Sequence, residues 1–309
     1  MHSRRDFVLG SSGLGAALAL GFKSPPPGAS GILGDGLFRI SLAQWSLHRE
    51  LRAGTLDNLG FAERARSYGA EGIEYVNAFF KERATDFEYL AQMRQRAMDA
   101  NVQSLLIMID GEGTLGATDD AERRSAVENH FKWIAAARFL GCHSIRVNAG
   151  GSGDWDEQMR LAADSLRRLA IFGDDYDIDV IVENHGGLSS HGKWLAATIE
   201  LADHERVGTL PDFGNFHLGD GEWYDRYEGV RELMPHAKAV SAKSHAFDAT
   251  GNETKTDYAR MLKIVLDAGY RGWIGIEYEG DGLSEADGIQ ATKSLLERTR
   301  AELAAEYRD

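Results

Sequence analysis

Four residues with metal-binding side chains each stand at the end of a short apolar segment. Glu183 follows VIV, Asp212 follows TLP, His245 follows AKS and Glu277 lies within GIEYE. If these segments are neighbouring strands, three carboxylates converge, repel one another and raise their own pKa values. A divalent cation removes that repulsion, and three oxygen donors with one nitrogen suit Mn²⁺, Mg²⁺ or Co²⁺. The residue types therefore predict one divalent metal ion, with Mn²⁺ preferred.

The segments that position these residues belong to a regular alternation along the chain. Apolar runs rich in Ile and Val occupy 38–45, 72–76, 104–109, 144–149, 179–184, 207–212, 239–245 and 273–279. Stretches with helical period lie between them, for example 121–140 and 257–269. Strands that are apolar on both faces indicate a parallel sheet covered by helices. The pattern predicts an α/β fold, a single-domain (β/α)₈ TIM barrel over residues 32–309, with an open doubly wound sheet as the alternative.

Further polar residues stand at the strand ends, where barrel enzymes place their active sites. Because side chains alternate along a strand, Glu183 shares a face with His185, and Lys243 shares one with His245. Singly, such residues are often surface charges or core groups, so the prediction depends on four successive strand ends. The predicted substrate-binding residues are His48, Glu74, Asn148, His185, Asn215 and Lys243.

The N-terminus has the parts of an export signal. Paired arginines in SRRDFVL (3–9) precede an uncharged run to Phe22, and then SPPPGASG. This order predicts a twin-arginine signal over residues 1–30 and a periplasmic or exported protein. The run is short for a spanning helix, so no stable membrane anchor is expected after signal removal. An ordinary N-terminal extension is the alternative.

Composition narrows the classes of partner. The formal charge of −14 argues against nucleic acid, because phosphate binding needs a basic face. Cys142 is the only cysteine, so no internal disulfide can form, and its place before an apolar run predicts a buried thiol.

The motifs VIVENHGG, LPDFGN, AKSH and GIEYEG resemble the xylose-isomerase-like TIM-barrel superfamily, over residues 37–300. That group includes ketose 3-epimerases, inosose dehydratases and family-2 AP endonucleases. The resemblance implies that Glu183, Asp212, His245 and Glu277 hold the metal. It also implies that Glu183 and Glu277 are the catalytic acid and base on opposite faces of a sugar. Ketose epimerases often carry histidines at two places where this chain has Asn215 and Lys243.

The predicted function is that of a divalent-metal-dependent carbohydrate isomerase or epimerase. It would abstract a proton next to a carbonyl and pass through a metal-stabilised enediolate. An exported enzyme should act on an unphosphorylated sugar, because sugar phosphates are mainly cytoplasmic. The alternative is a metal-dependent lyase that cleaves 3-keto-glycosides by β-elimination. An AP endonuclease and a non-catalytic sugar-binding barrel rank below these, and a homo-oligomer is left open.

Overall fold

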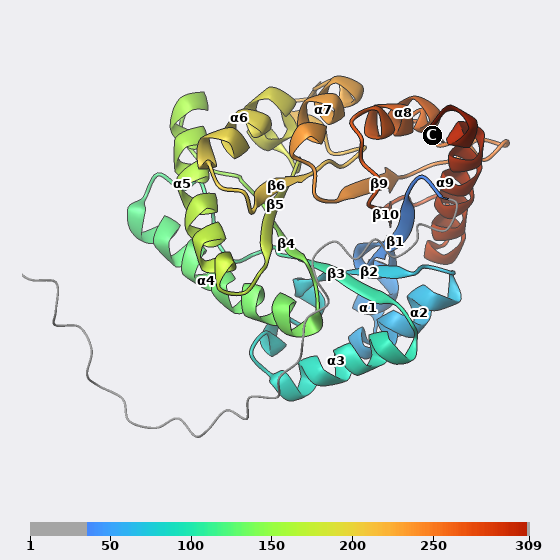
Figure 1. Ribbon diagram of the computed structural model, residues 1–309, viewed down its shortest axis with the longest axis horizontal. Coiled ribbons are helices and arrows are strands. Elements are labelled where there is room, and N and C mark those ends of the chain that lie inside the picture. Colours follow the sequence, from blue (N-terminus) through green and yellow to red (C-terminus); the bar gives the residue numbers. More distant parts are fainter. Residues whose placement is uncertain (1–35, 308–309) are drawn as a thin grey trace, which may run out of the picture. The chain divides into compact units, whose positions relative to one another are not determined.

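The computed structural model describes residues 36–307 and shows a barrel of parallel strands surrounded by helices (Figure 1). The barrel strands are β1 (Arg39–Ala43), β2 (Gly72–Val76), β3 (Gln103–Met108), β4 (Ser144–Val147), β5 (Asp179–Glu183), β6 (Val207–Leu210), β9 (Val240–Ser244) and β10 (Trp273–Tyr278). The α-helices are α1 (His48–Ala53), α2 (Phe61–Ser67), α3 (Phe87–Asp99), α4 (Asp120–Leu140), α5 (Trp155–Asp174), α6 (Gly192–Ala202), α7 (Arg226–Leu233), α8 (Tyr258–Asp267) and α9 (Glu285–Tyr307).

The eight strands follow one another around the sheet in the order β6-β5-β4-β3-β2-β1-β10-β9. Isolated parallel bridges join the segments of the two outer strands of this order, β6 and β9. They pair Thr209 of β6 with Ala237 before β9, and Asp212 after β6 with Ser241 of β9. The ring is thereby closed, which confirms the predicted (β/α)₈ barrel and rules out the open doubly wound sheet. Each predicted apolar run coincides with a barrel strand to within two residues at either end.

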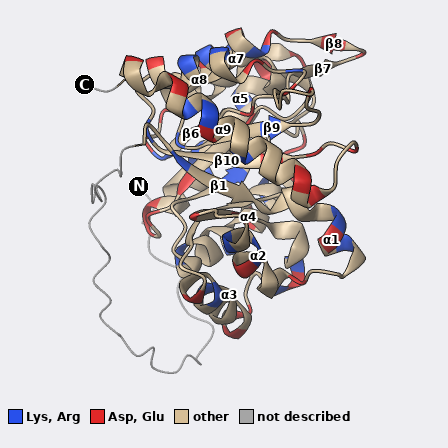
Figure 2. Ribbon diagram, turned by 90° about the vertical axis from the view of Figure 1, so that its right-hand side faces the viewer, with Lys and Arg blue, Asp and Glu red and all other residues tan. Residues whose placement is uncertain are grey.

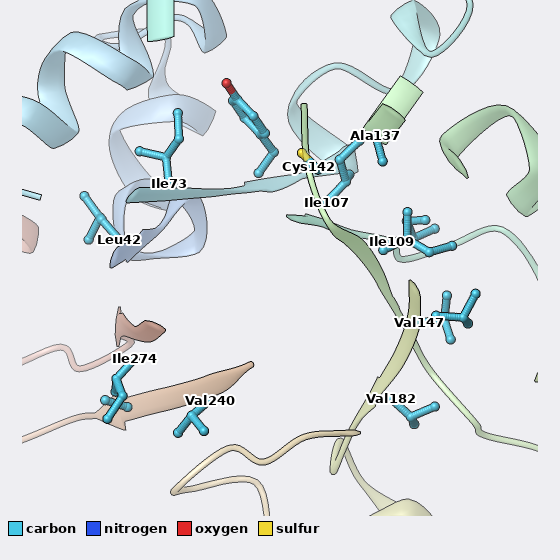
Figure 3. Packing of buried hydrophobic residues seen from close by; sticks show 14 of the residues in the cluster. Leu42, Ile73, Ile107, Ile109, Ala137, Cys142, Val147, Val182, Val240 and Ile274 are labelled. Atoms are coloured by element: carbon cyan, nitrogen blue, oxygen red, sulfur yellow. The ribbon is translucent and has the colours of Figure 1, made fainter. Parts of the chain in front are cut away.

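Two apolar layers hold the barrel together, one outside and one inside the ring of strands. The outer layer lies between strands and helices, and Figure 3 shows Leu42, Ile73, Val147 and Val182 pointing away from the ring. Cys142 belongs to this layer and is buried, as the sequence predicts. Burial of such surface stabilises a fold by roughly 25 cal/mol per Å².

The inner layer fills the barrel below the strand ends. Its buried members are Ala43, Val76, Leu106, Met108, Ile181, Leu210 and Ala239. Trp45 and Phe79 pack against this group from the side of the strand ends. Since apolar side chains fill the middle of the barrel, the polar side chains collect at the C-terminal ends of the strands.

A short hairpin projects from the chain between β6 and α7. It consists of β7 (His217–Gly219) and β8 (Glu222–Trp223), and Figure 2 shows it at the edge of the molecule. The same figure shows acidic and basic residues interspersed over the helices, without separation into two faces. The sequence did not predict these two strands, because they are short and largely polar.

The predicted export signal, residues 1–30, lies outside the described residues, as does the proposed start of the barrel at residue 32. Among residues 36–307, no helix has both the length and the apolar character that crossing a membrane requires.

Candidate active site

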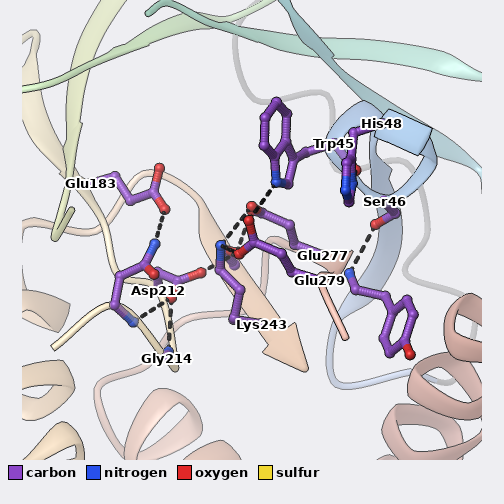
Figure 4. A network of polar contacts seen from close by, with 12 residues as sticks. Trp45, Ser46, His48, Glu183, Asp212, Gly214, Lys243, Glu277 and Glu279 are labelled. Atoms are coloured by element: carbon purple, nitrogen blue, oxygen red, sulfur yellow. Dashed lines mark hydrogen bonds and ion pairs between the residues drawn. The ribbon is translucent and has the colours of Figure 1, made fainter. Parts of the chain in front are cut away.

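Three buried carboxylates converge at the C-terminal end of the barrel. Glu183 ends β5, Asp212 follows β6 by two residues, and Glu277 lies near the end of β10. One oxygen from each lies within 4.8 Å of the other two. None of the three residues is more than 4% exposed, so water screens their charges poorly. The structure thus brings together three of the four predicted metal ligands (Figure 4).

The turn after β6 holds Asp212 in one orientation. Its Oδ1 accepts hydrogen bonds from the backbone N–H groups of Gly214 and Asn215, both at 2.8 Å. Its Oδ2 accepts a 2.6 Å hydrogen bond from Ser241 Oγ on β9. Asn184 fixes the same turn, because its Oδ1 accepts from the Asp212 N–H at 2.7 Å and its Nδ2 donates to the Asp212 carbonyl at 3.0 Å. Asp212 therefore needs no rearrangement to present its carboxylate.

A lysine ammonium lies among these carboxylates. Lys243 Nζ is 2.8 Å from Glu277 Oε1 and 3.0 Å from Glu279 Oε2 (Figure 4). Burial alone would lower the pKa of Lys243, but the surrounding carboxylates, Glu277 foremost, outweigh it and hold that pKa well above its ordinary value. Lys243 is therefore a fixed positive charge inside the site.

His245 directly follows β9, two residues after Lys243. In the ladder between β9 and β10, the partner of Glu277 is Lys243, so His245 comes at the height of Glu279, nearer the rim. Its side chain is half-buried. Within the described part of the chain, the group of converging ligand atoms contains no histidine. The assignment of His245 as a metal ligand stays a prediction.

A second buried cation stands on the opposite side of the site. Arg146 on β4 donates through Nη1 to Asp110 Oδ1 at 2.9 Å, and its Nε lies 2.8 Å from Glu183 Oε2. The latter pair lacks hydrogen-bond alignment, so that contact is ionic only. Asn148, a predicted substrate residue, donates to the same Asp110 oxygen at 2.7 Å. Arg146 was missed from the sequence, although an arginine within the apolar run SIRV was an available signal.

Two of the carboxylates titrate near neutral pH. Burial raises the pKa of Glu183 to about 7, against the opposing effect of Arg146. Burial likewise raises the pKa of Asp212 to about 7, against that of Lys243. A group with a pKa near the working pH can both give and take a proton at small cost in free energy.

The remaining predicted substrate-binding residues lie around the three carboxylates, at different positions along the barrel axis. Asn215 Nδ2 donates to Glu183 Oε1 at 2.9 Å. His185 and Asn215 both line a cavity of about 220 Å³ beside the carboxylates. At the rim, the His48 ring stacks on Trp45 with ring centres 4.9 Å apart, and Trp45 Nε1 donates to Glu279 Oε1 at 2.8 Å.

Glu74 lies deeper, in the packed interior of the barrel. It is 2% exposed, and its Oε1 accepts a 2.6 Å hydrogen bond from Ser41 Oγ. A Cβ atom on Gly275 would come 2.4 Å from the same oxygen, so only glycine leaves room for this carboxyl. Burial raises the pKa of Glu74 to about 8, so the group is mostly protonated at neutral pH.

The donor set fits a divalent cation in part. Four buried carboxylates (Glu74, Glu183, Asp212 and Glu277) face two buried cations, Arg146 and Lys243. The converging oxygens of three of them are the hard donors that Mg²⁺ and Mn²⁺ prefer. A protonated lysine cannot ligate a metal, and Lys243 already neutralises part of this charge. The site can therefore hold a metal through carboxylates, in competition with its own ammonium.

Sequence comparison settles the family. Residues 62–301 match the family described as "Xylose isomerase-like TIM barrel". The chain belongs to this family. One curated relative, the C-glycoside deglycosidase alpha subunit of Arthrobacter globiformis, is 35% identical over 83 residues, which are 25% of this chain. The chain spans only 22% of the length of that relative.

Solved structures of the same fold include sugar epimerases. A D-tagatose 3-epimerase-like protein superposes with a TM-score of 0.68 at 16% identity, covering 87% of this chain and 99% of that one. The 3-keto-D-glucoside 4-epimerase YcjR from E. coli superposes with a TM-score of 0.66 at 13% identity, covering 84% and 99%. At these identities the likeness establishes the shared fold.

Proposed function

We propose that this protein is a carbohydrate isomerase or epimerase that moves a proton at a carbon next to a carbonyl group. The observation that carries the proposal is the convergence of Glu183 and Glu277 from β5 and β10. Both are buried, and Glu183 has a pKa of about 7. Two carboxylates in such a site can serve as a base on one face of a substrate and an acid on the other.

The environments of the two glutamates differ in a way that suits these roles. Burial raises the pKa of Glu183 in the site without metal, which makes its carboxylate a stronger base towards the proton on the sugar carbon. Glu277 is paired with Lys243 at 2.8 Å and with Ser241 Oγ at 3.1 Å, which hold it in place as the partner on the other face. General acid–base catalysis of this kind contributes roughly 10²–10⁴-fold in rate.

Buried positive charge would stabilise the enolate that proton removal creates. Lys243 and Arg146 are both at most 4% exposed and flank the carboxylates from β9 and β4. Fixed charges in a water-poor site stabilise developing negative charge strongly, because they need no reorientation. Lys243 is thus proposed to act on the substrate oxygen, in keeping with its predicted place among the substrate-binding residues.

A divalent ion, proposed to be Mn²⁺, would be held by Glu183, Asp212 and Glu277, with His245 as the proposed fourth ligand. When bound, such an ion supplies a Lewis acid for the carbonyl oxygen. The convergence of three oxygens within 4.8 Å supports this part of the proposal.

Elimination from a 3-keto-glycoside is the second candidate. The same enolate, instead of regaining a proton at the carbon that lost it, expels the substituent on the neighbouring carbon. A carbon–carbon double bond then forms, and the substituent leaves with its bonding electron pair and takes up a proton. The match to the C-glycoside deglycosidase alpha subunit and the likeness to a 3-keto-D-glucoside 4-epimerase favour it. The predicted export signal also favours it, because an exported protein would meet unphosphorylated sugars and glycosides.

Proton NMR in D₂O separates these reactions in one assay. The protein with Mn²⁺ is incubated with free ketoses and, in parallel, with 3-keto-glycosides. Deuterium on the carbon next to the carbonyl, with a changed sugar, shows isomerisation or epimerisation, and release of the aglycone shows elimination. Glu277→Gln should abolish either signal, whereas Glu128→Gln on the exposed face of α4 should not. Full activity of Glu277→Gln would rule out the two-carboxylate scheme.

A further inference from the structure

A second binding site adjoins the carboxylates, and we propose that it holds the second ring of a neutral glycoside, stacked on Trp223. The substrate would then be at least a two-ring glycoside rather than a free sugar. This inference rests on the proposed function, since it names the form of the substrate that the same site would take.

Trp223 is exposed to an extent that the fold itself does not require. Its side chain is 60% exposed, whereas Trp133 and Trp194 are fully buried in the outer apolar layer. It lies on β8, opposite His217 on β7, and the two rings are centred 5.0 Å apart. A large, rigid aromatic ring left in water is a typical binding residue, because it offers contact area at a small cost in entropy.

The hairpin that carries Trp223 is anchored at its base. Phe216, directly before β7, is fully buried and packs so closely on α7 that a Cβ atom on Gly229 would come 2.1 Å from its ring. The Tyr224 N–H, directly after β8, donates to the Phe216 carbonyl at 2.8 Å. The backbone that carries Trp223 is therefore held in place, which lowers the entropy cost of ordering this residue when a ligand binds.

The cavity under Trp223 has the size and chemistry for one uncharged ring. Its volume of about 220 Å³ lies below the roughly 300–1,000 Å³ of sites for drug-sized ligands. It is lined by His185, Gly186, Gly214, Asn215, His217 and Trp223. This lining contains no carboxylate, lysine or arginine, which argues against a phosphate or a charged sugar. Imidazole and amide groups can donate to and accept from sugar hydroxyls.

The cavity shares a wall with the catalytic carboxylates. Asn215 lines it and also donates to Glu183 Oε1 at 2.9 Å. Gly214 lines it and donates its N–H to Asp212 Oδ1 at 2.8 Å. Because Gly214 and Asn215 belong to both places, a ring in the cavity would lie directly beside a reacting ring at the carboxylates, as two rings joined by a glycosidic bond do.

Kinetics on a matched pair of substrates test the second site. The pair is 3-keto-cellobiose and methyl 3-keto-β-glucoside, which both carry an anomeric leaving group but differ in the second ring. In Trp223→Ala we expect KM for the two-ring substrate to rise about tenfold, with the one-ring substrate unchanged. Trp223→Phe should keep most of the two-ring preference. Phe87→Ala removes an exposed aromatic side chain of α3 that does not line the cavity. It should leave KM unchanged for both substrates.

Calorimetry with unreactive sugars makes the test independent of turnover. The wild-type protein should bind cellobiose about tenfold more tightly than glucose, and Trp223→Ala should remove that difference. This result would support the second site even if no keto-sugar is converted, in which case only the proposed chemistry fails. Equal binding of cellobiose and glucose by the wild-type protein, or an unaltered preference in Trp223→Ala, would overturn the inference.

Discussion

The balance between the buried carboxylates and the buried cations of the site determines how strongly it can bind a metal ion. When all three are ionised, the converging carboxylates carry more negative charge than Arg146 and Lys243 neutralise. Lys243 lies at the height of Glu277, where it shares that carboxylate with any bound metal. The strength of metal binding should therefore depend on a residue that is not itself a ligand.

Lys243→Met tests this competition. The variant should bind Mn²⁺ about tenfold more tightly, because the ammonium no longer competes for Glu277. Without metal it should be less stable by roughly 3 kcal/mol, since breaking a buried ion pair leaves carboxylates unpaired. Titration calorimetry with Mn²⁺ and urea unfolding with and without metal measure the two effects.

Lys263→Met is the matched control, because Lys263 is a partly exposed lysine whose ion pair with Glu306 lies on the outer helices α8 and α9. It should change neither quantity by much. An unchanged Mn²⁺ affinity in Lys243→Met would show that the ammonium does not oppose the metal.

The sequence predicted which residues face the site, but not how far along the barrel axis each of them lies. Their position at successive strand ends predicted that Glu183, Asp212 and Glu277 meet in one place, and the three carboxylates converge there. Strand alternation also put Lys243 and His245 on one face. Which of those two lies level with Glu277 depends on the register between β9 and β10, and no single strand contains that information.

At the scale of elements, the turn after β6 depends on an amide from the neighbouring strand. Asn184 is fully buried and bonds to both backbone groups of Asp212. It follows the predicted ligand Glu183 directly, yet its role was missed, because its partners are backbone atoms that no sequence pattern marks. The polar β7–β8 hairpin escaped prediction for a related reason, since it lacks an apolar run.

Asn184→Ala should loosen the Asp212 turn. We expect a loss of roughly 2 kcal/mol in unfolding free energy, because two buried backbone groups lose their partners. Turnover should fall more than substrate affinity, since the Asp212 carboxylate loses its fixed orientation. Asn129→Ala on α4, which removes one hydrogen bond near the surface, should cost less than half as much. Equal losses in the two variants would contradict a special role for Asn184.

Contact between β2 and β10 explains the glycine in the middle of β10. Gly275→Ala should destabilise the barrel by roughly 1–3 kcal/mol, because the new methyl group would overlap the Glu74 carboxyl. Adding Glu74→Ala should recover part of this loss by removing the overlapping atoms. Urea unfolding of the two single variants and the double variant forms a double-mutant cycle. Additive losses would show that Glu74 is not the obstacle.

At the scale of the whole molecule, the barrel buries acids that prefer to be protonated. The pKa of the Glu74 carboxyl rises from an ordinary 4.5 to about 8 because the group is buried. Between these pH values the folded protein keeps a proton that the unfolded chain releases. The stability that this proton contributes is therefore fully present below about pH 4.5 and is lost as the pH rises to about 8. Glu183 and Asp212 should add to the same trend up to about pH 7.

Glu74→Gln isolates one part of that pH dependence. The carboxamide can still accept from Ser41 but has no charge to bury. Relative to the wild type, the variant should gain stability as the pH rises from about 5 to about 8, by up to roughly 1.4 kcal/mol per pH unit. Urea unfolding across this range measures the difference, with Glu128→Gln on the surface of α4 as the control. Parallel curves for Glu74→Gln and the wild type would mean that Glu74 is already ionised in the folded barrel, in which case Arg146 and Lys243 neutralise more of the buried charge than their contacts indicate.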